Sequence, residues 1–139
     1  MTSAIDPIPY PSQPILLNVE PTLFVTDFQR ALEFFTVRLG FKTAFTFGEP
    51  PFYGQVVRDA ALLNLRFVHE PVIDRSREVD LMSASIWVSN ARQLFLEFEA
   101  RGVSFHQILR REAWHGQGQG GFIIRDPDGN LIGFGGRTD

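Results

Sequence analysis

One stretch decides the fold: Arg125-Asp126-Pro127-Asp128-Gly129-Asn130-Leu131-Ile132-Gly133-Phe134. Pro127 fixes its own φ angle, and Asp128, Gly129 and Asn130 tolerate the left-handed conformations of a tight turn. Short apolar runs lie on both sides of this turn, and the run before it is Phe122-Ile123-Ile124. Residues of this kind favour strands. The stretch therefore predicts a β-hairpin.

A shorter copy of this hairpin occurs in residues 56–65, where the pair Arg58-Asp59 again ends one strand. Other positions repeat as well. Val25-Thr26-Asp27 matches Val88-Ser89-Asn90 at an offset of 63, Leu39-Gly40-Phe41 matches Arg101-Gly102-Val103 at 62, and the hairpins match at 67 to 69. A local coincidence would not keep nearly one register across strand, helix end and hairpin, so the sequence predicts an internal duplication.

Each half of the chain reads as a β-α-β-β-β module. In the first, strands are expected over 15–25, 41–47 and the hairpin 56–68, with a helix between the N-cap Asp27 and Gly40. In the second, strands are expected over 83–88, 103–109 and the last hairpin, with a helix between Asn90 and Gly102. The predicted fold class is α+β: two tandem modules form an open, cleft-bearing sheet. Module one covers about 15–69, a charged connector about 70–82 and module two about 83–136, all within one domain over 15–139.

Composition limits the function. The 139 residues are 44% hydrophobic and 21% charged, which is typical of one globular domain. The absence of cysteine excludes disulfides and thiolate chemistry and favours a cytoplasmic location. A net charge of -3 with scattered arginines gives no basic surface for nucleic acid. No apolar run is long enough to cross a membrane, so no membrane partner is expected.

The first fourteen residues contain four prolines, at positions 7, 9, 11 and 14. They predict an extended arm rather than a helix. The arm is either a loosely attached tail or a segment that embraces a second subunit. Pro21, inside the first predicted strand, indicates an edge position.

The two modules, the helix that closes in Leu39-Gly40-Phe41 and the final Asp-Pro-Asp-Gly-Asn turn resemble the vicinal oxygen chelate superfamily, over about residues 15 to 136. This superfamily includes glyoxalases, extradiol dioxygenases and bleomycin resistance proteins. Residues 20–27, residues 52–59 and Trp114 are most similar to the bleomycin resistance branch. That resemblance implies an antibiotic resistance function, a ligand cleft between two subunits, and a twofold homodimer with the proline-rich arm near the interface.

In metal-dependent members of this superfamily, each module supplies two ligands drawn from His, Glu and Gln. The repeat places the four positions at Glu20, Asn64, Ser83 and Gly133. Only Glu20 is an ordinary ligand for a divalent metal. His69, His106 and His115 have no spacing that would bring them together. We therefore expect no metal and no other cofactor, and the residues favour a binding protein over an enzyme.

Strand alternation places two kinds of residue on opposite faces. One face is purely apolar and is expected to take the helices: Leu23, Val25, Leu63, Leu65, Phe67, Ala84, Ile86, Val88, Ile132 and Phe134. The other mixes aromatic, glycine and polar residues, which suits a flat organic ligand. Its expected ligand-binding residues are Glu20, Phe24, Asn64, Arg66, Ser85 and Trp87. The alternative is that Phe24 and Trp87 fill the cavity and Glu20 pairs with Arg66.

The glycine-rich loop 112–121 contains Trp114, the remaining expected ligand-binding residue. Its glycines precede neither a Lys-Ser/Thr pair nor a helix, so this is not a phosphate loop. The loop either closes over a bound ligand or is simply mobile.

The sequence thus predicts a metal-free protein that sequesters a small aromatic or amphipathic molecule. The alternative is a metal-dependent lyase or dioxygenase, whose metal would polarise a carbonyl or bind vicinal oxygens. A third reading is a regulatory or structural module with no ligand. Glu20 favours a cationic or neutral guest and Arg66 an anionic one, so the charge of the ligand stays open.

Overall fold

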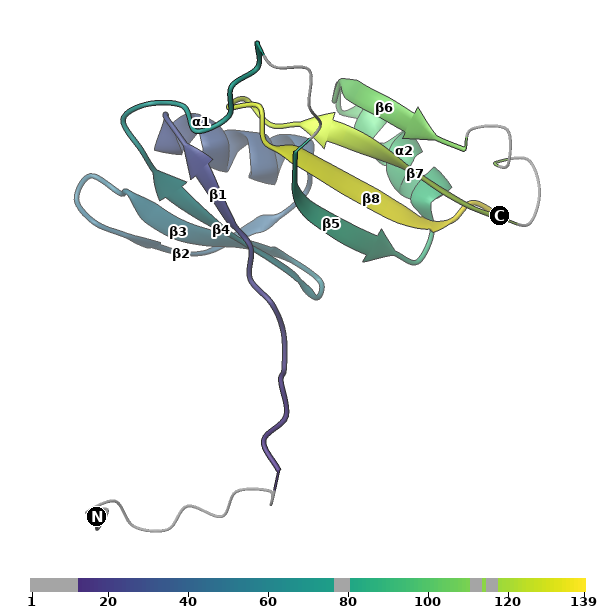
Figure 1. Ribbon diagram of the computed structural model, residues 1–139, viewed down its shortest axis with the longest axis horizontal. Helices are drawn as coiled ribbons and strands as arrows, with labels where there is room; N and C mark the ends of the chain where they lie inside the picture. Colours follow the sequence, from purple (N-terminus) through teal and green to yellow (C-terminus); the bar gives the residue numbers. More distant parts are fainter. Residues whose placement is uncertain (1–12, 77–80, 111–113, 115–117) are drawn as a thin grey trace.

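The computed structural model describes residues 13–76, 81–110, 114 and 118–139. Two four-stranded sheets have the strand orders β1-β4-β3-β2 and β5-β8-β7-β6, and in each the first strand is parallel to its neighbour (Figure 1). Within the described residues, no helix has the length and apolar character needed to span a membrane. The elements are β1 (Thr22–Val25), α1 (Phe28–Glu33), the π-helix η1 (Phe34–Arg38), β2 (Lys42–Phe47), β3 (Tyr53–Arg58), β4 (Ala61–Phe67), β5 (Met82–Val88), α2 (Ala91–Ala100), β6 (Phe105–Leu109), β7 (Gln119–Arg125) and β8 (Leu131–Arg137).

The order of these elements confirms the duplicated β-α-β-β-β pattern and the α+β class. The two helices begin alike, because the side chain of Asp27 accepts a hydrogen bond from the Arg30 N–H and that of Asn90 from the Gln93 N–H. They end alike too, at Gly40 and Gly102, whose φ angles are 74° and 78°. The sequence predicted all four positions.

The structure explains why the repeat offset falls from 63 to 62 along the helix. Module one holds one residue more between its N-cap and its terminal glycine, and η1 accommodates it. There the Leu39 N–H bonds the Phe34 carbonyl, five residues back, at 3.2 Å. A π-turn of this kind is how a helix absorbs a one-residue insertion.

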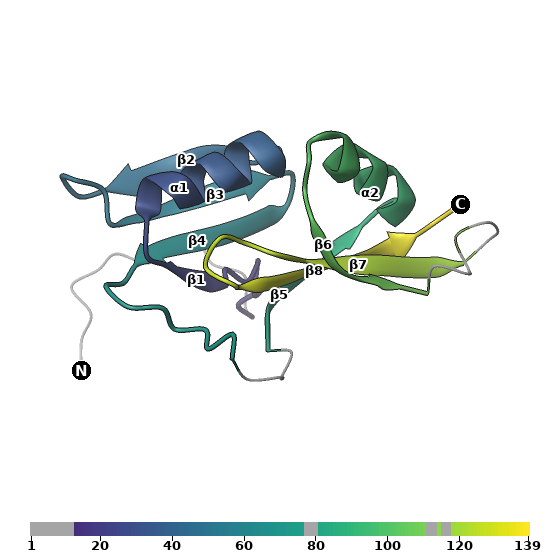
Figure 2. The same cartoon turned by 90° about the horizontal axis from the view of Figure 1, so that it is seen from above.

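The core lies between the sheets and the two helices, which cover the same side of the molecule (Figure 2). The predicted apolar face is confirmed. Leu23, Val25, Leu63, Leu65, Ile132 and Phe134 are buried in one cluster, and Phe67, Ala84, Ile86 and Val88 pack against it.

The prediction of a strand over 15–25 is wrong in its first part, because β1 includes only Thr22–Val25. Pro21 has no N–H to donate, although its carbonyl accepts from the Asn64 N–H at 2.9 Å. Its expected edge position is confirmed, since β1 is the first strand of its sheet. Residues 13–20 are exposed and project away from both sheets (Figure 1). Most of the predicted arm, residues 1–12, lies outside the described residues.

Hydrogen bonds between the modules follow the internal symmetry. The Arg38 Nη1 donates to the Arg101 carbonyl at 2.5 Å, and the Arg101 Nη1 donates to the Val37 carbonyl at 3.5 Å. On one side, the Arg58 guanidinium binds both carboxylate oxygens of Glu97 in α2, at 2.7 and 2.9 Å. This two-point contact lowers the pKa of Glu97 and raises that of Arg58. It fixes the first hairpin to the helix of the second module.

The turn between β7 and β8 is held by two buried side chains. Asp126 accepts hydrogen bonds from the Asn130 N–H, the Asn130 Nδ2 and the Asp128 N–H, at 2.7, 2.8 and 3.0 Å. The Asn130 Nδ2 also donates to the Phe24 carbonyl in β1, at 3.1 Å. The turn predicted from sequence therefore also joins the two modules.

Burial raises the pKa of Asp126 to about 6, despite these accepted hydrogen bonds. Because the pKa of Asp126 is higher in the folded chain than in the unfolded chain, protonation of Asp126 favours the folded state. This stabilising contribution is complete only at pH values below the unfolded pKa of 3.8. We expect its contribution to the free energy of unfolding to fall by about 3 kcal/mol as the pH rises from about 4 through about 6. Denaturant unfolding across this range should show the fall, and Asp126→Asn should lack it. An Asp126 carboxyl that titrates in NMR with a midpoint below about 4 would contradict the expectation.

Candidate functional site

Trp87 is the most conspicuous residue on the helix-free side. It lies on β5 with 77% of its surface exposed. Its ring is 3.7 Å from the position that a Cβ on Gly135 would occupy, so it covers bare backbone of β8. A Cβ at this position would be in ordinary van der Waals contact with the ring. The Trp87 ring therefore rests against the backbone of β8 and is otherwise exposed to solvent, an arrangement that suits stacking against a flat ligand.

A pocket of about 770 Å³ lies beside Trp87, between the modules. Leu62, Ser85 and Trp87 come from the helix-free face, while Phe41 and Phe98 belong to the core. Its volume is in the range of pockets for drug-sized molecules. Of the predicted ligand-binding residues, Ser85 and Trp87 line it.

Glu20 and Asn64 come together in a separate polar network. Gln55 joins them, because its Nε2 donates to Glu20 Oε1 at 3.0 Å and to Asn64 Oδ1 at 2.9 Å. The Asn64 Nδ2 also lies 3.4 Å from Glu20 Oε1. Val19 and Pro21, the sequence neighbours of Glu20, line the pocket, whereas Glu20, Gln55 and Asn64 do not.

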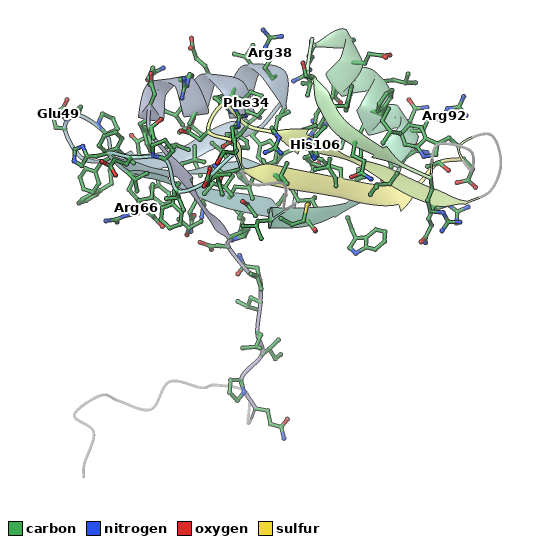
Figure 3. The ribbon with its side chains drawn as sticks, turned by 45° about the horizontal axis from the view of Figure 1, so that its top comes forward. Phe34, Arg38, Glu49, Arg66, Arg92 and His106 are labelled. Atoms are coloured by element: carbon green, nitrogen blue, oxygen red, sulfur yellow. The ribbon has the colours of Figure 1, made fainter. Side chains whose placement is uncertain are left out.

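The remaining residues of this face are largely aromatic. Phe24 and Arg66 are register partners on β1 and β4, and Tyr53 lies opposite Arg66 on β3. The Tyr53 ring is 6.0 Å from that of Phe45, which is 45% exposed. Arg66 is exposed and points outward (Figure 3). Within the described part of the chain, no ion pair joins Glu20 to Arg66.

The four metal-ligand positions do not offer a suitable set of donors. Glu20 and Asn64 already bond Gln55, and the Ser83 Oγ donates to Asn130 Oδ1 at 3.4 Å. Gly133 has no side chain and faces the methyl group of Met82. Among the described residues, no three His, Cys, Asp or Glu side chains are grouped as a metal site would require. The donors present do not fit a divalent metal.

The predicted place of Trp114 in the cleft needs correction. Its side chain is 4% exposed and lies in the core, with its ring 5.1 Å from that of Phe95 in α2. The indole N–H donates to the Leu109 carbonyl at 3.2 Å. A buried indole with a bonded N–H is a core residue. The proposed closing of loop 112–121 falls largely on residues 111–113 and 115–117, outside the described ones.

Sequence reasoning missed Gln55. The signal was available, because Gln55 lies opposite Asn64 in the first hairpin and therefore shares its face. His69 and His106 lie on different strands or strand ends, as expected. His69 contacts the ring of Phe67, whereas His106 lines another pocket.

The two helix-free faces of one chain do not oppose each other. Since both helices cover the same side of the sheets, both of these faces look toward the other side (Figure 2). The Glu20 network and Trp87 therefore form one open surface rather than two walls of a closed site.

Comparisons with known proteins agree with this architecture. A model of the Glyoxalase/Bleomycin resistance protein/Dioxygenase superfamily matches residues 17–134. No protein of curated function matches the chain in sequence.

Several solved structures share the fold at low sequence identity. TioX from Micromonospora sp. ML1 has a TM-score of 0.67 and 20% identity, and the match covers 86% of this chain and 98% of that one. The bleomycin-binding protein of bleomycin-producing Streptomyces verticillus, complexed with copper(II)-bleomycin, has a TM-score of 0.63 and 21% identity, with 88% and 97% covered. Lactoylglutathione lyase from Agrobacterium tumefaciens has a TM-score of 0.65 and 17% identity, with 89% and 96% covered.

Proposed function

This chain belongs to the Glyoxalase/Bleomycin resistance protein/Dioxygenase superfamily, and from that premise we propose that it is a metal-free binding protein. It sequesters a small aromatic or amphipathic molecule and makes or breaks no bond. One observation carries the proposal: Trp87, 77% exposed, packs beside Gly135 and lines a 770 Å³ pocket.

The energetics of this site favour binding over chemistry. Covering the Trp87 ring with a flat guest would remove apolar surface from water at about 25 cal/mol per Å². In the dimer proposed below, the network of Glu20, Gln55 and Asn64 offers a charged acceptor opposite Trp87 of the other subunit, where it can orient a donor of the guest. A lyase or dioxygenase of this superfamily would need a metal that these donors do not suit.

The bleomycin-binding neighbour suggests a biological role. Its structure contains copper(II)-bleomycin, an antibiotic. We propose that this chain likewise confers resistance by holding a toxic small molecule, in the cytoplasm.

A thermal-shift panel tests the proposal. Bleomycin with and without copper(II), together with other aromatic antibiotics, should include a compound that raises the melting temperature in proportion to the logarithm of its concentration. Elemental analysis of protein purified without chelators should find no stoichiometric metal. Stoichiometric nickel, zinc, manganese or iron, or a panel without any shift, would count against a metal-free binder.

We further propose that the protein is a twofold homodimer whose clefts lie between subunits. Four apolar residues that directly follow the predicted arm are exposed, Ile15, Leu16, Leu17 and Val19, at 71, 97, 87 and 85%. An exposed apolar segment of this kind marks an interaction surface. A second copy could cover it and also close the open helix-free surface, placing Trp87 of one subunit opposite the Glu20 network of the other.

Sedimentation at micromolar concentration should give twice the 15.8 kDa of the chain. Leu16→Asp together with Leu17→Asp should weaken the dimer at least about tenfold, because each change places a charge in an apolar contact. Val72→Asp is the matched control, since Val72 is 58% exposed but lies outside residues 15–19. A wild-type monomer at this concentration would refute the dimer.

A further inference from the structure

The internal symmetry of the chain is broken in charge at a pocket on the helix side. Arg58 ends β3 and binds Glu97 of α2 at 2.7 Å. Its counterpart is Arg125, which ends β7 in the same Arg-Asp pair. The counterpart of Glu97, however, is Phe34, 63 positions earlier. The first arginine thus binds a carboxylate, whereas the second lines a pocket together with a phenyl ring.

A pocket of about 550 Å³ occupies this place. Arg38, Arg75, Arg125 and His106 line it together with Phe34 and Asp126. Phe34 and Arg38 come from η1 and His106 comes from β6 (Figure 3). This pocket is separate from that of Trp87 and shares none of its lining residues.

The charge in the pocket is not balanced by its own residues. Three arginines face one carboxyl group, Asp126, whose oxygens already accept hydrogen bonds from Asn130 and Asp128. The Arg125 Nη1 donates to the Gly129 carbonyl at 3.2 Å, and the Arg75 Nε lies 2.7 Å from where a Cβ on Gly129 would be. Among the described residues, neither arginine forms an ion pair. Both side chains therefore lie at the same turn, and in the part of the chain that the structure describes neither is paired with the Asp126 carboxyl.

We propose that this pocket binds a small organic phosphate, a phosphate monoester with an apolar or aromatic body. The formal charge of its lining, three arginines against one carboxyl, complements the charge of a phosphate monoester, about -1.5 to -2 at neutral pH. Guanidinium groups bind phosphate oxygens through paired hydrogen bonds. The apolar body would lie against Phe105 and against Phe34, the residue that stands at the position equivalent to Glu97, the carboxylate partner of Arg58.

Calorimetric titration at low ionic strength tests this site with phenyl phosphate, phenol and benzoate as probes. Low salt matters because Arg38 and Arg75 are exposed and their charges are screened. Phenyl phosphate should bind, benzoate should bind at least about tenfold more weakly, and phenol should not bind measurably. The amide signals that shift in NMR should include those of residues 34, 38, 106 and 125.

Variants locate the site. Phe34→Glu recreates the carboxylate of the symmetric position, and Phe34→Gln removes the same ring without adding a charge. Phe34→Glu should bind phenyl phosphate at least about tenfold more weakly than Phe34→Gln does. Arg75→Gln, an exposed position that does not threaten folding, should weaken phenyl phosphate binding at least about tenfold relative to wild type. Arg137→Gln, at the opposite end of β8, removes the same charge and should have no effect.

Four results would overturn the proposal: no binding of phenyl phosphate, equal binding of phenol, equal binding of benzoate, or unchanged affinity in Arg75→Gln together with equal affinities in Phe34→Glu and Phe34→Gln. Binding of a probe at the Trp87 pocket is distinguished by shifts of the Ser85 and Trp87 amide signals, because the two pockets share no lining residue.

Discussion

Asn130→Ala is expected to lower the free energy of unfolding by about 3 kcal/mol. The Asn130 side chain is 2% exposed and its Nδ2 donates to both Asp126 and Phe24. Alanine would leave the Phe24 carbonyl and an Asp126 oxygen without this donor. It would also remove a link between β1 and the last hairpin. Urea unfolding monitored by circular dichroism measures the change.

Asn90→Ala provides the comparison for this variant. The side chain of Asn90 also forms a hydrogen bond with the backbone, but at the solvent-exposed start of α2. There it caps the helix by accepting a hydrogen bond from the Gln93 N–H. Loss of such a cap costs about 1 kcal/mol. Equal losses in the two variants would show that the buried link between modules contributes nothing beyond an ordinary surface hydrogen bond.

Trp87→Ala is expected to weaken ligand binding at least about thirtyfold, which corresponds to a hot spot of about 2 kcal/mol. The exposed indole provides most of the flat apolar area beside the 770 Å³ pocket, and alanine removes it. The antibiotic that gives the largest thermal shift with wild type should give none with this variant. Because the ring is 77% exposed, the fold itself should lose little stability.

Trp114→Phe is the control, since the chain has two tryptophans and Trp114 is the buried one. This variant should unfold at a lower temperature, because it loses the hydrogen bond to Leu109 and part of its contact with Phe95. Its ligand-induced shift should nevertheless remain. Loss of the shift in Trp114→Phe alone would place the ligand at the other tryptophan.

Local chemistry made much of the fold predictable. The Asp128-Gly129-Asn130 turn, the N-caps Asp27 and Asn90 and the terminal glycines each have one dominant conformational preference. Strand alternation then assigned the apolar residues to the helix side, and it brought Glu20 and Asn64 to one face.

Features that depend on packing between elements were not predictable in this way. Trp114 follows no periodic pattern, so nothing in the sequence indicated that its ring reaches Phe95. The separation of Trp87 from Glu20 depends on how the two modules lie against each other, through contacts such as that of Arg58 with Glu97. The pocket lined by Arg38, Arg75 and Arg125 also depends on packing between elements, because its residues come from both modules.

Mixing two defective chains tests most directly whether a ligand lies between Trp87 of one subunit and Glu20 of the other. Trp87→Ala and the double variant Glu20→Ala, Asn64→Ala should each bind the best antibiotic of the panel poorly. Half of the dimers in an equal mixture would be mixed, and each would contain one intact cleft, so about a quarter of all clefts should recover wild-type affinity in a calorimetric titration. No recovery after subunit exchange would contradict a shared cleft, because both walls would then belong to the same chain.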